Sequence, residues 1–279
     1  MIPFNFIYFR PGTLREAVEI FHQLSKEGKK AYYYAGGSEI ISMCRVGAIK
    51  PDAVIDIKSI PDCMQLECDR EAIFIGSACT LSHIKDSGCF PLLGKASGRI
   101  ADHTNQCRIT LGGNLCGSIR YREASLPLLL TDADITLFSV SGERTVPFRS
   151  VFDGRMRKEA GEIVVSVTVP ALAASAPYFH IKKTGNEKID YPLVSISALV
   201  KDDTLHVAVS GVCSNPFRSK ALELLVNDHS LPRRSRVERA YGTLPEQPYS
   251  DAEASGEYRA FVFKNTIEEI LEAFENGKV

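Results

Sequence analysis

The sequence lacks a strong charge of either sign and lacks any long apolar run. Its 33 basic and 34 acidic side chains leave a formal net charge of −1, which argues against nucleic acid or an anionic membrane surface as a partner. The longest apolar stretch, around residues 126–130, is far too short to span a bilayer. The first six residues contain no basic segment and no small-residue cleavage site, so we expect no signal peptide. A soluble, cytoplasmic protein is the expectation.

The motifs of several common enzyme classes are also absent. There is no Gly-x-x-x-x-Gly-Lys-Ser/Thr phosphate loop, no Gly-x-Gly-x-x-Gly dinucleotide turn and no Gly-x-Ser-x-Gly nucleophile turn. The six histidines show no spacing typical of metal ligands. The chain therefore offers little acid–base or metal chemistry of its own, and we predict neither a catalytic side chain nor a metal site.

Cysteine is plentiful, but its spacing argues against a metal cluster. None of the eight cysteines forms a Cys-x-x-Cys pair, and the closest two, Cys63 and Cys68, have no second pair at zinc-like spacing. An iron–sulfur cluster would also need tighter clustering. We expect most of the cysteines to be reduced, buried, small apolar residues in a reducing compartment.

Length and composition are those of an ordinary globular protein. A chain of 279 residues corresponds to about two domains, and 44% of its residues are hydrophobic. The alternation of apolar residues from Leu205 to Val209 predicts a sheet with one covered face, and the basic run 233–236 is typical of a solvated face. Periodicity and turn residues predict helices at 13–26, 81–100 (interrupted), 126–131, 219–226 and 258–275, strands at 53–57, 64–66, 72–75, 134–140, 162–169, 178–182, 194–200 and 204–211, and a linker at 170–177.

The stretch 31–47 has the pattern of a strand, a two-glycine turn and the start of a helix. Small and aromatic residues lead into Gly36 and Gly37, and Ser38 can cap the following helix. Because glycine has no Cβ, a ligand can approach the backbone, and the free N–H groups and dipole of a helix start favour an anion. The alternative is an ordinary strand–turn–helix corner without a ligand.

A second pair of adjacent glycines, Gly112 and Gly113, lies beside Asn114, whose side chain can both donate and accept hydrogen bonds. In isolation this stretch could be a tightly turned core segment. Two glycine pairs suited to backbone contact with phosphate, in a chain with little chemistry of its own, are typical of a scaffold whose bound cofactor carries the reaction.

These segments resemble, in the same order, the FAD-binding (medium) subunits of the molybdenum hydroxylases, the xanthine dehydrogenase and carbon monoxide dehydrogenase group. Residues 34–40, Tyr-Ala-Gly-Gly-Ser-Glu-Ile, are similar to the Ala-Gly-Gly-Thr/Ser-Asp-Leu motif of that family. Residues 110–115, Thr-Leu-Gly-Gly-Asn-Leu, are similar to its Thr-Ile-Gly-Gly-Asn signature. Further similar segments, spread over nearly the whole chain, are 51–57, 126–133, Lys182 with Asp190 and 194–195, 215–218, and 255–259.

The resemblance implies an α+β fold with a two-part FAD-binding region. A small N-terminal α/β subdomain would span residues 1–60, and a middle α+β subdomain would span residues 61–172. A C-terminal domain of antiparallel sheet and helices, residues 173–279, would cap the flavin. The composition of the chain also changes near residues 60 and 172.

The resemblance also assigns cofactor-binding residues. The first glycine loop would wrap the FAD pyrophosphate, and the second motif would contact phosphate and the ribityl–flavin side. Glu123, in place of a usual aspartate, would accept a hydrogen bond from a ribityl or ribose hydroxyl, although a solvated loop carboxylate is an equal alternative. Lys182 would lie near the isoalloxazine edge and stabilise reduced anionic flavin. The two loops contribute Ala35, Gly36, Gly37, Ser38, Glu39 and Ile40, and Thr110, Gly112, Gly113 and Asn114.

As to function, the resemblance implies the FAD-binding subunit of a molybdenum hydroxylase of the xanthine dehydrogenase type. Electrons from a molybdenum-cofactor large subunit would reach FAD through the [2Fe-2S] clusters of a small subunit, with NAD⁺ as the expected acceptor. Two departures are Arg120-Tyr121-Arg122, where small and proline residues are usual, and Asn186, where arginine is usual. A free-standing flavin-dependent oxidoreductase and a non-enzymatic binding protein remain alternatives. The first would need an acid or base beside the flavin, and the second is encouraged only by residues 120–122.

Overall fold

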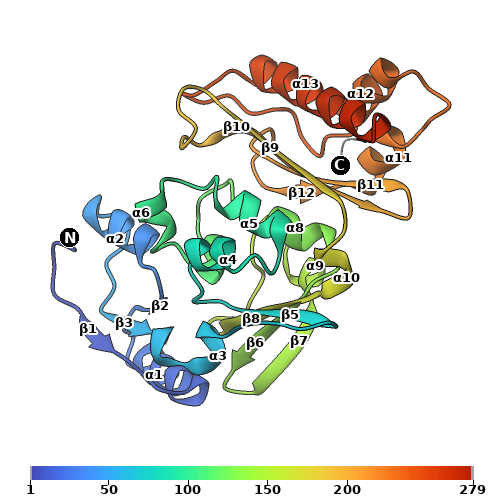
Figure 1. Cartoon of the computed structure of the whole chain (residues 1–279). Coiled ribbons are helices and arrows are strands. Elements are labelled where there is room, and N and C mark those ends of the chain that lie inside the picture. The colour runs from blue at the N-terminus through green and yellow to red at the C-terminus, as the bar shows by residue number, and fades with distance from the viewer. Residues whose placement is uncertain (1, 278–279) are drawn as a thin grey trace.

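The computed structural model describes residues 2–277, and these residues contain three β-sheets (Figure 1). The first is a parallel sheet with strand order β1-β3-β2, the second an antiparallel sheet of order β4-β5-β8-β6-β7, and the third an antiparallel sheet of order β12-β11-β10-β9. The predicted α+β fold is confirmed. The strands are β1 (Ile7–Phe9), β2 (Ala31–Tyr34), β3 (Ala53–Asp56), β4 (Leu66–Cys68), β5 (Ala72–Gly76), β6 (Asp134–Ser139), β7 (Gly142–Pro147), β8 (Ile163–Pro170), β9 (Tyr178–Thr184), β10 (Pro192–Lys201), β11 (Thr204–Ser210) and β12 (Phe217–Arg218).

Helix α1 (Leu14–Lys26) packs against the parallel sheet. Thr13 caps this helix, because its hydroxyl accepts a hydrogen bond from the N–H of Glu16 at 3.2 Å. The apolar face of α1 packs in one core with β3 and with Ile163 and Val165 of β8. The first sheet is therefore joined to the second through a shared core, and helix α2 (Ser38–Arg45) leaves the end of β2 at its edge.

Short helices cover the five-stranded sheet on the side that faces the C-terminal sheet (Figure 1). Their apolar residues form the largest core, which Leu199 and Ala208 of the C-terminal sheet also join. Helix α8 is buried along its whole length because it lies between the two sheets. The helices of this region are α4 (Leu81–Ser87), α5 (Pro91–Ser97), α6 (His103–Gln106), α7 (Leu111–Cys116), α8 (Ser125–Leu130), α9 (Phe148–Val151) and α10 (Ala171–Ala174). Helix α3 (Pro61–Met64) and the 3₁₀ turn η1 (Ile57–Ser59) pack instead in the core of the N-terminal sheet.

The C-terminal sheet is covered on both faces, so the prediction of one covered face is wrong. Helix α8 packs against β10 and β11 from one side. Helices α11 (Lys220–Val226), α12 (Arg233–Tyr241) and α13 (Gly256–Glu275) form a core with Leu205, Val207 and Val209 on the other. The alternation of apolar residues along a strand indicates one buried face. It gives no signal for the other face when the residues there are small or polar, as Ala208 is, even if a helix packs on them.

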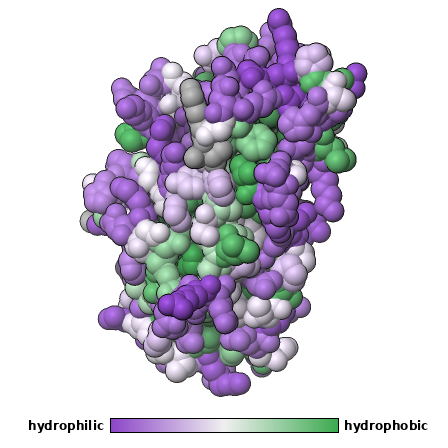
Figure 2. Space-filling view, turned by 45° about the vertical axis from the view of Figure 1, so that its right-hand side comes forward, coloured by the Kyte–Doolittle hydropathy of each residue, from purple (hydrophilic) through white to green (hydrophobic). Residues whose placement is uncertain are grey.

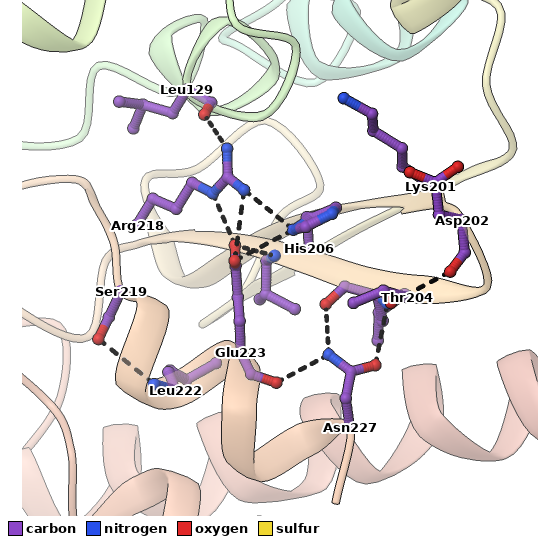
Figure 3. A network of polar contacts seen from close by, with 12 residues as sticks. Leu129, Lys201, Asp202, Thr204, His206, Arg218, Ser219, Leu222, Glu223 and Asn227 are labelled. Carbon is purple, nitrogen blue, oxygen red and sulfur yellow. Dashed lines mark hydrogen bonds and ion pairs between the residues drawn. The ribbon is translucent and has the colours of Figure 1, made fainter.

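A buried ionic network ties α11 to α8 (Figure 3). The guanidinium of Arg218 contacts the Glu223 carboxylate, with Nε to Oε1 at 2.6 Å, and donates to the Leu129 carbonyl of α8 at 2.8 Å. His206 completes the group, with its Nδ1 3.1 Å from Glu223 Oε2. Burial alone would raise the pKa of Glu223, but the hydrogen bonds from Arg218 and His206 hold that pKa below its usual value. Arg218, on β12, thus connects the C-terminal sheet and its helices to α8 of the middle region.

Most predicted elements are confirmed within a few residues, with specific exceptions. The strand predicted at 64–66 lies at 66–68, and residues 61–64 form a helix, because Pro61 at the first helical position favours a helix start. The helical stretch 81–100 is two helices, separated at Gly88, whose φ is +68°. The linker 170–177 contains α10. In the basic run 233–236, Arg236 is buried and contacts Glu275 and the Val226 carbonyl, so that run is not simply a solvated face.

The cysteine prediction is wrong for half of the residues. Cys68 and Cys89, 21 residues apart, form a disulfide. Cys107 and Cys116 are free but exposed. The remaining four match the expectation of free, buried thiols and are Cys44, Cys63, Cys79 and Cys213. Sequence separation alone could not predict the pairing, which depends on β4 and the α4–α5 turn lying side by side.

Among the described residues, no helix has both the length and the apolar character needed to cross a membrane.

Candidate functional site

The first glycine corner has a backbone that accepts no side chain. A Cβ at Gly36 would collide with the carbonyl oxygen of Arg108, and a Cβ at Gly37 would collide with the ring of Tyr34. Gly37 also has φ +72°, a left-handed conformation that favours glycine. Gly37, and not Ser38, is the N-cap of α2, so the predicted capping role of Ser38 is wrong. Ser38 is the first helical residue and is followed by Glu39 and Ile40.

Donors at this corner lack partners in the described part of the chain. A glycine N-cap offers no side-chain oxygen to the N–H groups of the first helical turn. The hydroxyl of Ser38 is buried and has no hydrogen-bond partner. Such orphaned groups at a helix N-terminus fit an anionic ligand, because the ligand would satisfy them and the helix dipole would favour its charge.

Side chains at the carboxyl edge of the parallel sheet support the same corner. Asp56, at the end of β3, accepts hydrogen bonds from Tyr8 Oη at 2.6 Å and from Lys58 Nζ at 2.7 Å. Although burial acts to raise it, these hydrogen bonds hold the pKa of the Asp56 carboxyl below its usual value. Lys58 Nζ also donates to the carbonyl of Ala35 at 2.9 Å and lies over the ring of Tyr34. Lys58 therefore places a positive charge beside the glycine corner, which the sequence analysis did not identify.

The second glycine motif is the first turn of a helix, not a free loop. Thr110 is the N-cap of α7, and its hydroxyl accepts from the N–H of Gly113 at 3.2 Å. The N–H of Gly112 is bonded to the Ser77 carbonyl at 2.8 Å, and the Asn114 side-chain oxygen accepts from Ala124 N–H at 3.2 Å. The backbone N–H groups of the second motif are therefore used inside the protein, and Gly113 presents an exposed, side-chain-free surface.

The two glycine motifs, far apart in the sequence, nevertheless meet. Gly36 packs directly on the backbone of Arg108, just before the second motif. From the other side, one oxygen of the Glu39 carboxylate accepts hydrogen bonds from both the N–H and the hydroxyl of Ser118, each at 2.7 Å. Glu39 thus joins the two segments to each other, and this contact occupies part of the carboxylate that was predicted to face the cofactor.

Two further predicted site residues are Glu123, just before α8, and Lys182, on β9 of the C-terminal sheet. Both are buried, and Lys182 Nζ donates to Glu123 Oε2 at 3.1 Å and to the Arg99 carbonyl at 2.7 Å. Burial raises the pKa of the Glu123 carboxyl, and the Lys182 ammonium offsets part of this effect. The second oxygen, Oε1, is buried without a partner. Because Glu123 is buried, the alternative of a solvated loop carboxylate is wrong, and a ligand hydroxyl could satisfy Oε1.

The unusual segment 120–122 has a structural explanation. Arg122 is buried and donates to the carbonyls of Gly117 and Gly154, each at 2.9 Å. Tyr121 stacks on Tyr191 with ring centroids 5.0 Å apart, and its carbonyl accepts from Ser210 Oγ at 2.6 Å. The segment therefore connects the end of the second glycine motif to the C-terminal sheet, which removes the sequence observation that encouraged a cofactor-free binding protein.

The imidazole of His180, two residues before Lys182 on β9, gives a pH-dependent prediction. Burial, followed by the nearby cations Lys95, Arg99 and Lys182, lowers the pKa of His180 from 6.5 to about 3. Because the unfolded chain takes up this proton below pH 6.5 and the folded chain does not until about pH 3, stability is fully present above pH 6.5 and is lost as the pH falls.

The expected difference is measurable by urea unfolding at several pH values. Between pH 7 and 4.5, wild type should lose roughly 2–3 kcal/mol more unfolding free energy than the His180→Gln variant. The carboxyls whose pKa values are shifted, Asp56, Glu123 and Glu223, are the same in both proteins, so their contributions cancel in the comparison. Parallel stability curves for the two proteins would contradict the prediction.

Comparisons with known proteins identify the family and the fold of the chain. The family model described as the FAD binding domain in molybdopterin dehydrogenase matches residues 3–172. Over 286 residues the chain is 24% identical to the 6-hydroxypseudooxynicotine dehydrogenase complex subunit alpha of Paenarthrobacter nicotinovorans, covering 97% of this chain and 95% of that protein. It is 29% identical over 195 residues to the carbon monoxide dehydrogenase medium chain of Hydrogenophaga pseudoflava, covering 67% of each. In fold it is similar to the crystal structure of quinoline 2-oxidoreductase from Pseudomonas putida 86, with a TM-score of 0.87, 20% identity and 99% of both chains covered.

Proposed function

Because the chain belongs to the family of FAD-binding domains of molybdopterin dehydrogenases, we propose that it is the flavin subunit of a xanthine dehydrogenase-like molybdenum hydroxylase that passes electrons to NAD⁺. The observation that carries the proposal is the meeting of the two glycine motifs, with the unpartnered Ser38 hydroxyl in the first motif and Lys58 bonded to the Ala35 carbonyl beside it. Bound FAD would supply the exchange of one and two electrons between carriers. The chain itself would bind, orient and shield the cofactor.

Individual side chains have distinct parts in this proposal. The first turn of α2 and the Ser38 hydroxyl would hold the pyrophosphate, with Lys58 balancing its charge. The free Oε1 of Glu123 would accept a hydrogen bond from a ribityl or ribose hydroxyl. Lys182, fixed between Glu123 and the Arg99 carbonyl, would place its positive charge near the isoalloxazine edge. The exposed surface of Gly113 would let the cofactor lie close to α7.

We also propose the three-part organisation 1–60, 61–172 and 173–279. Two observations support it: each of the three sheets lies within one of these ranges, and the matched family segment ends at residue 172. In the assembly we propose, a molybdenum-cofactor subunit and a [2Fe-2S] subunit contact this chain. Figure 2 shows a largely hydrophilic surface with apolar side chains gathered in the middle of the face in view. Exposed apolar residues such as Leu172, Leu224 and Phe261 offer contact area for partner chains.

The test is spectroscopic. The purified chain should show a flavin absorbance spectrum, at about one FAD per chain, that bleaches on addition of NADH. A colourless protein that takes up no added FAD would overturn the proposal and would favour the cofactor-free binding protein. A flavin that is bound but does not bleach with NADH would leave FAD binding standing and reject NAD⁺ as the acceptor.

The alternative of a free-standing flavin-dependent oxidoreductase is separated from the proposal by co-purification. A subunit should retain molybdenum and iron–sulfur partners when it is isolated from its native host under mild conditions. The free-standing enzyme would need its own acid or base beside the flavin, whereas the buried carboxylate at this position, Glu123, is engaged by Lys182. Isolation of a catalytically active single chain without metal would favour that alternative.

A further inference from the structure

A separate hollow lies where helices α4 and α5 face strand β9. Its cavity of about 350 Å³ is lined by four basic side chains, by Pro91 and by two glycines, and none of the lining residues is acidic. The two glycines, Gly94 and Gly98, let α5 pack closely on α4, because a Cβ at Gly94 would lie 3.4 Å from Lys85 Cα and one at Gly98 would lie 3.1 Å from Lys85 Cδ. The basic side chains are Lys85, Lys95, Arg99 and His180.

Within residues 2–277, the cations of this cavity have no carboxylate paired with them: the Glu123 carboxylate, which acts on Arg99, is already paired with Lys182. Among the described residues, Lys85, Lys95 and Arg99 form no ion pair, although fifteen pairs occur elsewhere in the same part of the chain. Lys95 lies over the ring of Tyr178, with Nζ 5.6 Å from the ring centroid. Several cations gathered without anions in a concave, partly buried place repel one another, and an anionic ligand would relieve this repulsion.

Two buried nitrogen atoms of the lining residues have no hydrogen-bond partner. The His180 side chain is 7% exposed, and its Nδ1 lies 3.0 Å from the Ser197 hydroxyl, which fixes the ring. Its Nε2 is buried and unpartnered, as is the Nε of Arg99. Buried polar atoms are almost always hydrogen-bonded, so two orphans on the wall of one basic cavity indicate a missing polar ligand.

We propose that this cavity is a second anion site, which binds the phosphate group of an organic molecule. Phosphate oxygens accept several charge-assisted hydrogen bonds at once, and both Arg and Lys are common partners for them. The cavity is larger than a lone phosphate and falls in the range of small-molecule pockets. It shares no lining residue with the glycine corner, where Gly36, Ser38 and Lys58 gather, and so it is distinct from the pyrophosphate site of the proposed function.

The test uses pyrophosphate as the probe, titrated by calorimetry into the full chain saturated with FAD, so that the flavin site is already filled. Wild type should bind one pyrophosphate saturably, with an affinity that falls as salt increases. The exposed pair Lys85→Gln/Lys95→Gln should weaken this affinity at least about tenfold, because two charge-assisted contacts are removed. The matched control Lys30→Gln/Lys188→Gln removes two exposed lysines away from the cavity and should change it little.

His180→Leu provides a second variant, which keeps the charge of the cavity at neutral pH and has no side-chain donor, and it should weaken pyrophosphate binding without changing FAD content. No saturable binding to FAD-loaded wild type, or equal affinity in the Lys85→Gln/Lys95→Gln variant, would overturn the second site. Displacement of pyrophosphate by FAD in the FAD-free chain, with loss of FAD affinity in the same variant, would also overturn it, because the cavity would then belong to the flavin site. If the chain takes up no FAD at all, the proposed function fails, while the pyrophosphate titration can still be read.

Discussion

The Gly37→Val variant is expected to purify without FAD, with at least about a hundredfold loss of flavin affinity relative to wild type. Gly37 combines a φ of +72° with a collision between any Cβ and the ring of Tyr34. A valine would therefore push apart the end of β2 and the start of α2, and its branched side chain would occupy the space through which a phosphate approaches the helix N-terminus. Flavin content per chain, measured by absorbance after gel filtration, checks the prediction.

The other end of α2 supplies a matched control. Gly47 has φ +73° and nothing within 4 Å of a Cβ position, so Gly47→Val carries a similar backbone strain without touching the corner. Both variants should lose comparable stability from the backbone, and only Gly37→Val should lose the flavin. A Gly37→Val protein that is folded by circular dichroism and fully yellow would show that this corner does not hold the pyrophosphate.

The Arg218→Met variant is expected to lower the free energy of unfolding by about 3–5 kcal/mol, because it leaves the buried Glu223 carboxylate without its main partner. The two side chains are only 10% and 9% exposed, and the guanidinium also loses its hydrogen bond to the Leu129 carbonyl of α8. Removing one partner of a buried pair costs more than the pair itself contributes. Urea unfolding at neutral pH measures the change.

Two further variants separate this effect from a general loss of charge. In the double variant Arg218→Met/Glu223→Gln the uncompensated charge is gone, so much of the lost stability should return. Lys264→Met breaks the more exposed pair with Glu238 and should cost less than about 1 kcal/mol. Equal losses in Arg218→Met and Lys264→Met would show that burial of the network does not control its energy.

Local chemistry made several elements predictable from the sequence. The Thr13 cap and an apolar stripe define α1. The hydroxyls of Ser219 and Ser255 cap α11 and α13 by accepting hydrogen bonds from the backbone N–H groups three residues on, so these helices are encoded by neighbours along the chain. The order of the family-like motifs along the chain was also sufficient to indicate the FAD-binding family. Features that depend on residues distant in the sequence were predicted wrongly or not at all. The basic run predicted Arg236 to be solvated, but in the structure Glu275 and the Val226 carbonyl of α11 contact it. The disulfide between Cys68 and Cys89 was not predicted.

The candidate site also has features that the sequence determines and features that only the tertiary structure determines. By itself, the sequence determined where the backbone is bare, because the glycine pairs at 36–37 and 112–113 are read directly from it. Only the tertiary structure decided which hydrogen-bonding groups stay free. In the fold the N–H of Gly112 is bonded to the Ser77 carbonyl, the Glu39 carboxylate accepts from Ser118, and the Glu123 carboxylate is buried against Lys182. The physical reason is that glycine is selected by local geometry, whereas the availability of a hydrogen-bonding group depends on what the rest of the chain has already brought to it.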